Sequence, residues 1–300
     1  MKKRVILDTD IGTDIDDAIA LAYMYTHSNL CEIVGIATVG GNTKLRADIA
    51  HTVLTTLSAS DNQLPDIKQG FTHSFRGVRG YFSGVEATNY TLKEMPSDQK
   101  SENAKTQTIT QWYKDKLTSS TKPSEILAIG ALTNIAKTIT QFPSTLKYIS
   151  NIYFMGGICT QNKSVVPNTL SHNVSEDPTA AKIVFDSGIP LTILTKDIPL
   201  QHSYTLPEFK KSLLNQSPIE SLLYAHAREM ITHSKRNSIT LYDPILAMVM
   251  LEPELAAYTQ YGHISEITQI HFNPKEKFSE LVAKMSVTQT SYEPWRNAEK

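Results

Sequence analysis

Residues 4–25 read RVILDTDIGTDIDDAIALAYMY, and they place five aspartates within ten residues between two apolar runs. The first run, residues 4–7, is typical of a strand buried on both faces, and residues 18–25 have the apolar pattern of a helix. Gly12 allows the acidic turn between them to bend tightly. A buried strand that leads through a short turn into a helix opens a βαβ unit, so this stretch predicts an α/β fold.

The same alternation of strand-like and helix-like runs continues along the chain. It predicts a mainly parallel sheet with helices on both faces. We expect residues 90–124 to be helical or loop, and the polar tail after residue 287 to be loosely held. The predicted strands are residues 33–39, 125–129, 148–155 and 190–194, and the predicted helices are residues 45–57, 134–142, 178–187, a pair within 204–238, and 245–251.

The composition is that of an ordinary globular protein. Of 300 residues, 40% are hydrophobic and 20% are charged, and the formal net charge is −1. The chain has neither the basic excess of a nucleic-acid-binding protein nor a polybasic run for a membrane surface. The apolar run at residues 5–7 is too short for a signal peptide or a membrane span, and two cysteines make no disulfide framework. We therefore expect a cytoplasmic protein without nucleic-acid or membrane partners.

The five aspartates of residues 8–17 follow the first predicted strand directly. In an open parallel sheet, ligands bind beyond the carboxyl ends of the strands. Carboxylates packed together there repel one another unless a cation or solvent offsets their charge, and hard oxygen ligands suit Ca²⁺ or Mg²⁺. The alternative is a solvated acidic turn in which Asp16 or Asp17 caps the following helix.

Other predicted strands end in small or polar residues as well. Residues 39–42 read VGGN, residues 129–134 read IGALTN, and residues 155–157 read MGG. Each segment alone is explained by turn chemistry, but their recurrence after successive strands indicates a ligand edge. Asp177 and Asp243, each followed by proline, are suited to cap helices, and Asp243 could also turn one oxygen towards a metal.

Taken together, the motifs resemble the inosine–uridine-preferring nucleoside hydrolase family. The segments VILDTDIGTDIDDAIAL, ATVGGN, LAIGALTNIA, FMGG, HNVSEDPTAA and YDPILA occur in the family's order between about residues 4 and 250. The resemblance implies an open, Rossmann-like sheet in a single nucleoside hydrolase-like domain covering residues 1–300. It also implies calcium-dependent hydrolysis of the N-glycosidic bond of ribonucleosides, with release of ribose and free base. The resemblance also implies a homo-oligomer, either a dimer or a tetramer, that acts in purine or pyrimidine salvage.

The resemblance further implies a Ca²⁺ site. Its ligands would be Asp10, Asp17, Asp243 and the backbone carbonyl of Ile129. Asp10 would also act as the general base on a water held by the ion. The bond breaks through a ribose with oxocarbenium character, and nearby carboxylates would stabilise that positive charge.

Three residues match positions that contact ribose in the family, namely Asp16, Asn42 and Asn173. The chain carries two extra residues before the Asp16-Asp17 pair, so Asp14 could take the role of either aspartate.

The chain departs from the family where the base and the ribose 5′ group would bind. Tyr242 stands where a histidine, a candidate acid, is frequent. Ser171-His172-Asn173 replaces Glu-Phe-Asn, whose glutamate reaches the 5′-hydroxyl, so the 5′ side could accept a group larger than a hydroxyl. A His-Gly pair expected near residue 82 is absent. Candidates to assist the leaving base are His172, His226 and Tyr242, with Tyr224, Arg228 and His233 as further options and Trp112 or Tyr113 for stacking on the base, although each also suits a packing or surface role.

Two other functions are compatible with parts of the sequence. Asp8-Thr9-Asp10 after a strand resembles the haloacid dehalogenase phosphatases, in which the first aspartate is the nucleophile. That family requires threonine or valine where this chain has Gly12, and a second acidic pair that this chain lacks downstream. The missing histidine and glutamate instead suit a nucleoside- or ribose-binding protein that has lost catalysis.

Overall fold

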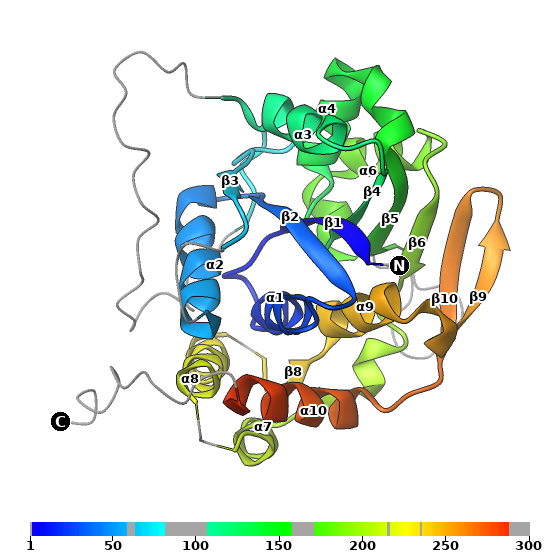
Figure 1. Ribbon diagram of the computed structural model, residues 1–300. Coiled ribbons are helices and arrows are strands. Elements are labelled where there is room, and N and C mark those ends of the chain that lie inside the picture. Colours follow the sequence, from blue (N-terminus) through cyan, green and yellow to red (C-terminus); the bar gives the residue numbers. More distant parts are fainter. Residues whose placement is uncertain are drawn as a thin grey trace.

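An eight-stranded sheet forms the centre of the molecule (Figure 1). The computed structural model describes residues 2–58, 64–81, 107–157, 171–214, 217–234 and 236–287. The strands lie in the order β3-β2-β1-β4-β5-β6-β10-β9, and all neighbouring pairs are parallel except β10 with β9. The strands are β1 (Lys3–Thr9), β2 (Cys31–Thr38), β3 (Ile67–Gln69), β4 (Ser124–Ala128), β5 (Ile149–Met155), β6 (Leu191–Leu194), β9 (Ala256–Tyr261) and β10 (Ile264–Ile270).

The strand order reverses next to β1. The chain runs outward from β1 to β2 and β3, then returns to the other side of β1 for β4, β5 and β6. In open α/β sheets such a reversal leaves a crevice beyond the carboxyl ends of the two central strands, and ligands bind there. The acidic turn after β1 and the glycine-containing turn after β4 flank this crevice.

Helices cover both faces of the sheet, which confirms the predicted architecture (Figure 1). One hydrophobic core joins the sheet to α1, α2 and α9, with α7, α8 and α10 packed outside them, and a second core joins it to α3, α4 and α6. The helices are α1 (Asp16–Thr26), α2 (Thr43–Leu57), α3 (Ile109–Thr118), α4 (Thr133–Gln141), α5 (His172–Glu176), α6 (Pro178–Phe185), α7 (Leu206–Ser212), α8 (Pro218–His233), α9 (Tyr242–Leu251) and α10 (Pro274–Val287). Short 3₁₀ helices span Pro143–Tyr148, Pro199–Gln201 and Pro253–Leu255, and β7 (Ser203–Tyr204) pairs with β8 (Ile239–Thr240).

Alternation along β1 explains why its sequence is apolar throughout. Val5 and Leu7 enter the core under α1, whereas Ile6 enters the core under α3 and α4. All three side chains are fully buried. Each contributes about 1.5–3 kcal/mol of transfer free energy, which fixes the strand between the two helical layers.

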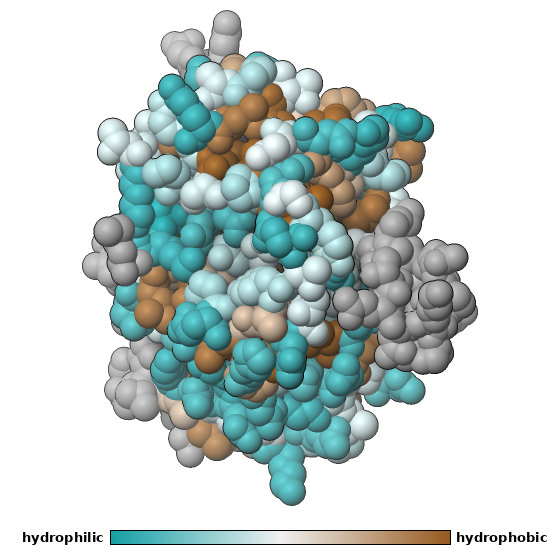
Figure 2. Space-filling model, turned by 90° about the vertical axis from the view of Figure 1, so that its right-hand side faces the viewer, coloured by the Kyte–Doolittle hydropathy of each residue, from teal (hydrophilic) through white to brown (hydrophobic). Residues whose placement is uncertain are grey.

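The predicted strands and helices are present, with ends shifted by a few residues. The hairpin of β9 and β10 and the helix α10 were not predicted, because β9 is half-exposed and has no apolar run. Figure 2 shows the side of the molecule that bears this hairpin, and hydrophilic side chains cover its lower part. The polar tail after residue 287 and Cys159 lie outside the described residues.

Within the described part of the chain, no helix combines the length and the hydrophobicity needed to cross a membrane.

Candidate active site

A pocket of about 290 Å³ lies beyond the carboxyl ends of β1, β4, β5 and β6. Its wall is built from the segments that follow these strands, from α5, and from the first turns of α1 and α9. The predicted site residues that line it are Asp10, Asp14, Asp16, Asp17, Ile129, His172, Asn173, Tyr242 and Asp243. The sheet thus brings the two distant ends of the sequence match together at the strand-order reversal.

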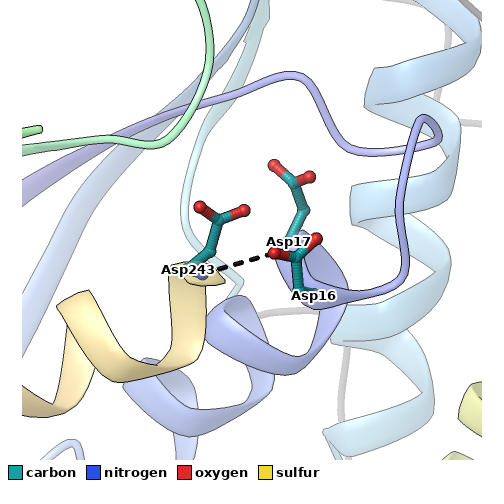
Figure 3. A group of neighbouring side chains, drawn as sticks. All are labelled: Asp16, Asp17 and Asp243. Carbon is teal, nitrogen blue, oxygen red and sulfur yellow. Dashed lines mark hydrogen bonds between the residues drawn. The ribbon is translucent and has the colours of Figure 1, made fainter. Parts of the chain in front are cut away.

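Three carboxylates form the most compact group in the pocket (Figure 3). Asp16 and Asp17 lie in the first turn of α1, and Asp243 lies in the first turn of α9. One oxygen of each lies within 4.8 Å of the others, and all three side chains are buried. The backbone N–H of Asp243 donates to Asp16 Oδ2 at 3.3 Å, so the two helix starts are held against each other.

None of these three aspartates caps its helix. The N-cap positions are Ile15 for α1 and Leu241 for α9, and neither makes a side-chain capping bond. The capping interpretation was therefore wrong for Asp16, Asp17 and Asp243, because all three lie inside the first turn of their helix, with their carboxylates in the pocket. Asp177, in contrast, accepts from the N–H of Ala180 at 3.0 Å and caps α6 as predicted.

Burial makes the negative charge of this group costly. Desolvation raises the pKa of Asp16 to about 7, against hydrogen bonds from backbone N–H groups that lower it, and the charge of Asp10 raises it further. The pKa values of Asp17 and Asp243 are raised well above the ordinary range by burial and then by the neighbouring carboxylates. A divalent cation at this position would offset both effects, and an all-oxygen donor set suits a hard ion such as Ca²⁺.

Asp10 faces the same pocket but stands outside the compact group. Its Oδ2 lies 4.0 Å from Arg46 Nη2 and 3.9 Å from His172 Nε2. The structure thus groups Asp16 with Asp17 and Asp243, where the sequence had grouped Asp10 with them. The Arg46 guanidinium beside Asp10 accounts for this difference, since it attracts the Asp10 carboxylate towards its own side of the pocket.

Sequence reasoning missed Arg46, a fully buried arginine on α2. Its guanidinium donates to the segment after β1 and to two other backbone segments, and so holds the acidic turn in place. The acceptors are the carbonyls of Asp10, Ile11 (2.8 Å), Gly40 (2.8 Å) and Tyr81 (2.7 Å) and the Thr13 hydroxyl (2.9 Å). No local pattern marks such a residue, because one arginine in an amphipathic helix ordinarily faces solvent.

Asp8 points away from the pocket. Its carboxylate accepts hydrogen bonds from the Tyr113 hydroxyl and from Asn134 Nδ2, the latter at 3.1 Å. Burial raises the pKa of Asp8 to about 7, although both hydrogen bonds lower it. A buried carboxylate held under the sheet edge cannot attack a substrate in the pocket, so the phosphatase alternative loses its nucleophile. Tyr113 is buried and occupied with Asp8, and Trp112 is buried on α3, where its Nε1 donates to Asp66.

The two predicted asparagines have structural contacts. Asn173 Nδ2 donates to the carbonyls of Ile129 and Met155, each at 2.9 Å, and so ties the ends of β4 and β5 together beside the pocket. Asn42 Oδ1 accepts from the N–H of Leu45 at 3.2 Å and caps α2. Asn42 is not among the described residues that line the pocket.

The candidates to assist the leaving group divide into two sets. His172 and Tyr242 line the pocket, and burial raises the pKa of the Tyr242 phenol, so it stays protonated at neutral pH. His226 lies in the interior of α8, away from the pocket lining, and burial lowers its pKa to about 4. Tyr224, Arg228 and His233 belong to the same helix and also lie outside the lining. Lining residues that the sequence did not indicate include Thr13, Ser171, Lys196 and Arg236.

A sequence model of the inosine-uridine preferring nucleoside hydrolase family matches residues 5–291. The chain belongs to this family. The nucleoside hydrolase is 26% identical over 262 residues to probable uridine nucleosidase 1 of Oryza sativa subsp. japonica, covering 84% of this chain and 78% of that one. It is 28% identical over 256 residues to the non-specific ribonucleoside hydrolase RihC of Salmonella enteritidis, covering 84% and 79% of the two chains.

Solved structures agree with the fold of this nucleoside hydrolase. The purine-preferring ribonucleoside hydrolase from Gardnerella vaginalis superposes with a TM-score of 0.76 at 20% identity, covering 95% of this chain and all of that chain. The family and the fold together identify an enzyme of the nucleoside hydrolase class, with a small-molecule nucleoside as its substrate.

Proposed function

We propose that this nucleoside hydrolase uses Ca²⁺ to cleave the N-glycosidic bond of ribonucleosides, releasing ribose and free base. The observation that carries the proposal is the buried group of Asp16, Asp17 and Asp243 at the strand-order reversal. Buried carboxylates this close are rarely tolerated without a compensating cation.

The proposed cation ligands are Asp17 and Asp243 from the compact group, with Asp10 and the carbonyl of Ile129 from the same pocket. When bound, the ion would supply positive charge that lowers the pKa of a neighbouring water and orients the ribose hydroxyls. Asp16 is proposed to accept a hydrogen bond from a ribose hydroxyl.

Each of the remaining steps is assigned to side chains of the pocket. Asp10 is proposed as the general base, because it faces the pocket without belonging to the most compact group. As the bond from C1′ to the base nitrogen breaks, the carboxylates stabilise positive charge on the sugar. Tyr242 and His172, which line the pocket, are proposed as candidate donors to the departing base.

A reducing-sugar assay over purine, pyrimidine and nicotinamide ribosides, with and without chelator, tests the proposal. We expect release of ribose that stops with chelator and resumes with added Ca²⁺. Intact nucleoside binding without any release of sugar would favour the alternative of a binding protein that has lost catalysis. From the resemblance we further propose a cytoplasmic dimer or tetramer that acts in nucleoside salvage, and light scattering tests the assembly state.

A further inference from the structure

One wall of the pocket is cationic, although its floor is acidic. Lys196 lies two residues past the end of β6, is half-buried, and lines the pocket together with the floor aspartates. Among the residues that the structure describes, its ammonium makes no hydrogen bond and no ion pair. An ammonium has three donors and no acceptor, so this group is available to an anionic acceptor entering the pocket.

Two further groups extend this wall. The Arg236 guanidinium lines the pocket, forms an ion pair with Asp14, and is 48% exposed. The His172 ring is 44% exposed, and its Nε2 lies 3.9 Å from Asp10 and 4.0 Å from Glu176. Arg236 and His172 are thus near carboxylates, whereas Lys196 carries a positive charge that the described residues leave unneutralised.

We propose that Lys196, assisted by Arg236, binds a phosphate on the 5′ carbon of the ribose, so that the preferred substrates are ribonucleoside 5′-monophosphates. This inference rests on the proposed function. The 2′- and 3′-hydroxyls and the 5′ group leave the ribose ring on opposite sides. The hydroxyls can therefore face the acidic floor while the phosphate faces the cationic wall.

The chemistry of the wall favours a phosphate over a neutral hydroxyl. A hydroxyl accepts only weakly from an ammonium, whereas a phosphate forms short, charge-assisted hydrogen bonds with it. A phosphate nearer the floor would be repelled by the carboxylates, which fixes the orientation of the sugar. In the reaction the C1′–N bond breaks, the water oxygen bonds to C1′, and one water proton ends on the base. The products are ribose 5-phosphate and free base.

The test compares kcat/KM for uridine and inosine with kcat/KM for their 5′-monophosphates. We expect the wild type to prefer the monophosphates, and Lys196→Met to lower the ratio of monophosphate to nucleoside by about tenfold or more, as for loss of one charge-assisted hydrogen bond. Lys196→Glu should lower it further. Lys211→Met, which removes an exposed lysine of α7, is the matched control and should leave the ratio unchanged. Higher ionic strength should raise KM for the monophosphates only.

Other outcomes are decisive as well. Release of base from nucleosides with a ratio that Lys196→Met does not change would overturn the inference and leave the proposed function intact. Lys196-dependent preference for a base carrying a carboxylate, as in orotidine over uridine, would overturn the 5′ assignment. If no substrate is cleaved, the proposed function fails. The inference is then tested by calorimetry, which compares the binding of ribose 5-phosphate with that of ribose in the presence of Ca²⁺. Tighter binding of the phosphorylated sugar, lost in Lys196→Met, supports it, and equal binding overturns it.

Discussion

At the residue scale, identical side chains at the end of β1 have different environments. Asp8 still belongs to the strand and points into the layer of α3 and α4, where Tyr113 and Asn134 donate to it. Thr9 points to the opposite face and donates to Asp17 Oδ1 at 2.5 Å. Asp10 lies just past the strand and faces the pocket. In a continuing strand Asp8 and Asp10 would share a face, so the end of β1 at Thr9 is what separates a structural carboxylate from one that faces the pocket.

The role proposed for Asp10 predicts a selective loss of turnover. Asp10→Asn keeps the size of the side chain but removes the proton acceptor, so kcat should fall by about 100-fold or more while the protein remains folded. Single-turnover kinetics beside a thermal melt measures both effects. Asp115→Asn, an exposed position on α3, is the control and should behave as the wild type. A near-normal rate for Asp10→Asn would remove this residue from the mechanism.

Arg46 predicts a loss of stability instead. Arg46→Met would remove the donors of five hydrogen bonds, three of them buried, and the positive charge beneath the acidic turn, so we expect the free energy of unfolding to fall by about 3–5 kcal/mol. Urea unfolding measures this change. Arg228→Met, which replaces an arginine whose side chain is 53% exposed, should cost no more than about 0.5 kcal/mol. Equal costs for the two variants would show that Arg46 does not hold the turn.

At the scale of elements, the pocket depends on close packing between the turns that follow β1 and β4. A Cβ at Gly130 would lie 2.7 Å from Val39 Cγ1 and 2.9 Å from the backbone nitrogen of Asp10. Both distances are too short for a methyl group, so the two turns approach this closely only because residue 130 is glycine.

Gly130→Ala should therefore displace Asp10 and lower kcat, by about 10- to 100-fold if the shift approaches 1 Å. Gly35→Ala is the matched control, because its Cβ would lie 2.6 Å from Trp112 Cζ2, in the opposite helical layer. We expect that variant to lower the melting temperature while the folded fraction keeps its kcat. Equal kcat values for the two variants, corrected for folded fraction, would contradict this account of the turn.

The sequence predicts the central elements well because their patterns are strong. The carboxyl-terminal halves of β1, β2, β4 and β5, and all of β6, are buried on both faces, as is typical of central parallel strands. The β9–β10 hairpin escaped prediction because its side chains are half-exposed and its pairing is set by the neighbouring β6. Whether such edge strands form depends on tertiary contacts and not on the local sequence pattern.

The sequence predicts one part of the site and not the other. Carboxylates directly after a strand are indicated by position alone, and Asp10, Asp16, Asp17 and Asp243 all line the pocket. The cationic wall was not predicted, because Lys196 and Arg236 lie in segments with no motif of their own. His226 was predicted as a candidate to assist the leaving base, but it is buried in the interior through the packing of α8 and does not line the pocket.

At the scale of the whole molecule, a nearly neutral protein concentrates negative charge at one end of its sheet. The formal net charge is −1, yet five buried carboxylates line one pocket. Two helix N-termini, those of α1 and α9, point their positive dipole ends at this group and offset part of the repulsion. The repulsion that is not offset destabilises the folded, metal-free protein at any pH at which these carboxylates are ionised.

This imbalance predicts how pH and Ca²⁺ act on stability. The pKa of Asp16 is about 7 in the folded protein, against an ordinary value of 3.8. Between these two values the folded state binds more protons than the unfolded state. The free energy of unfolding of the metal-free protein should therefore fall as pH rises from about 4 to about 7. Calcium should stabilise most at the upper end, where it no longer competes with protons for the carboxylates.

Thermal melts at pH 5.5 and pH 8, with chelator or with Ca²⁺, measure both effects. With Ca²⁺ at about 100 times its dissociation constant, we expect the melting temperature to rise by about 5–10 °C at pH 8 and by clearly less at pH 5.5. Asp243→Asn removes one carboxylate from the compact group, so it should raise the stability of the metal-free protein at pH 8 while weakening the response to Ca²⁺. A calcium response that is equal at both pH values, or unchanged in that variant, would mean that the ion binds elsewhere. The buried aspartates would then need another source of compensating charge.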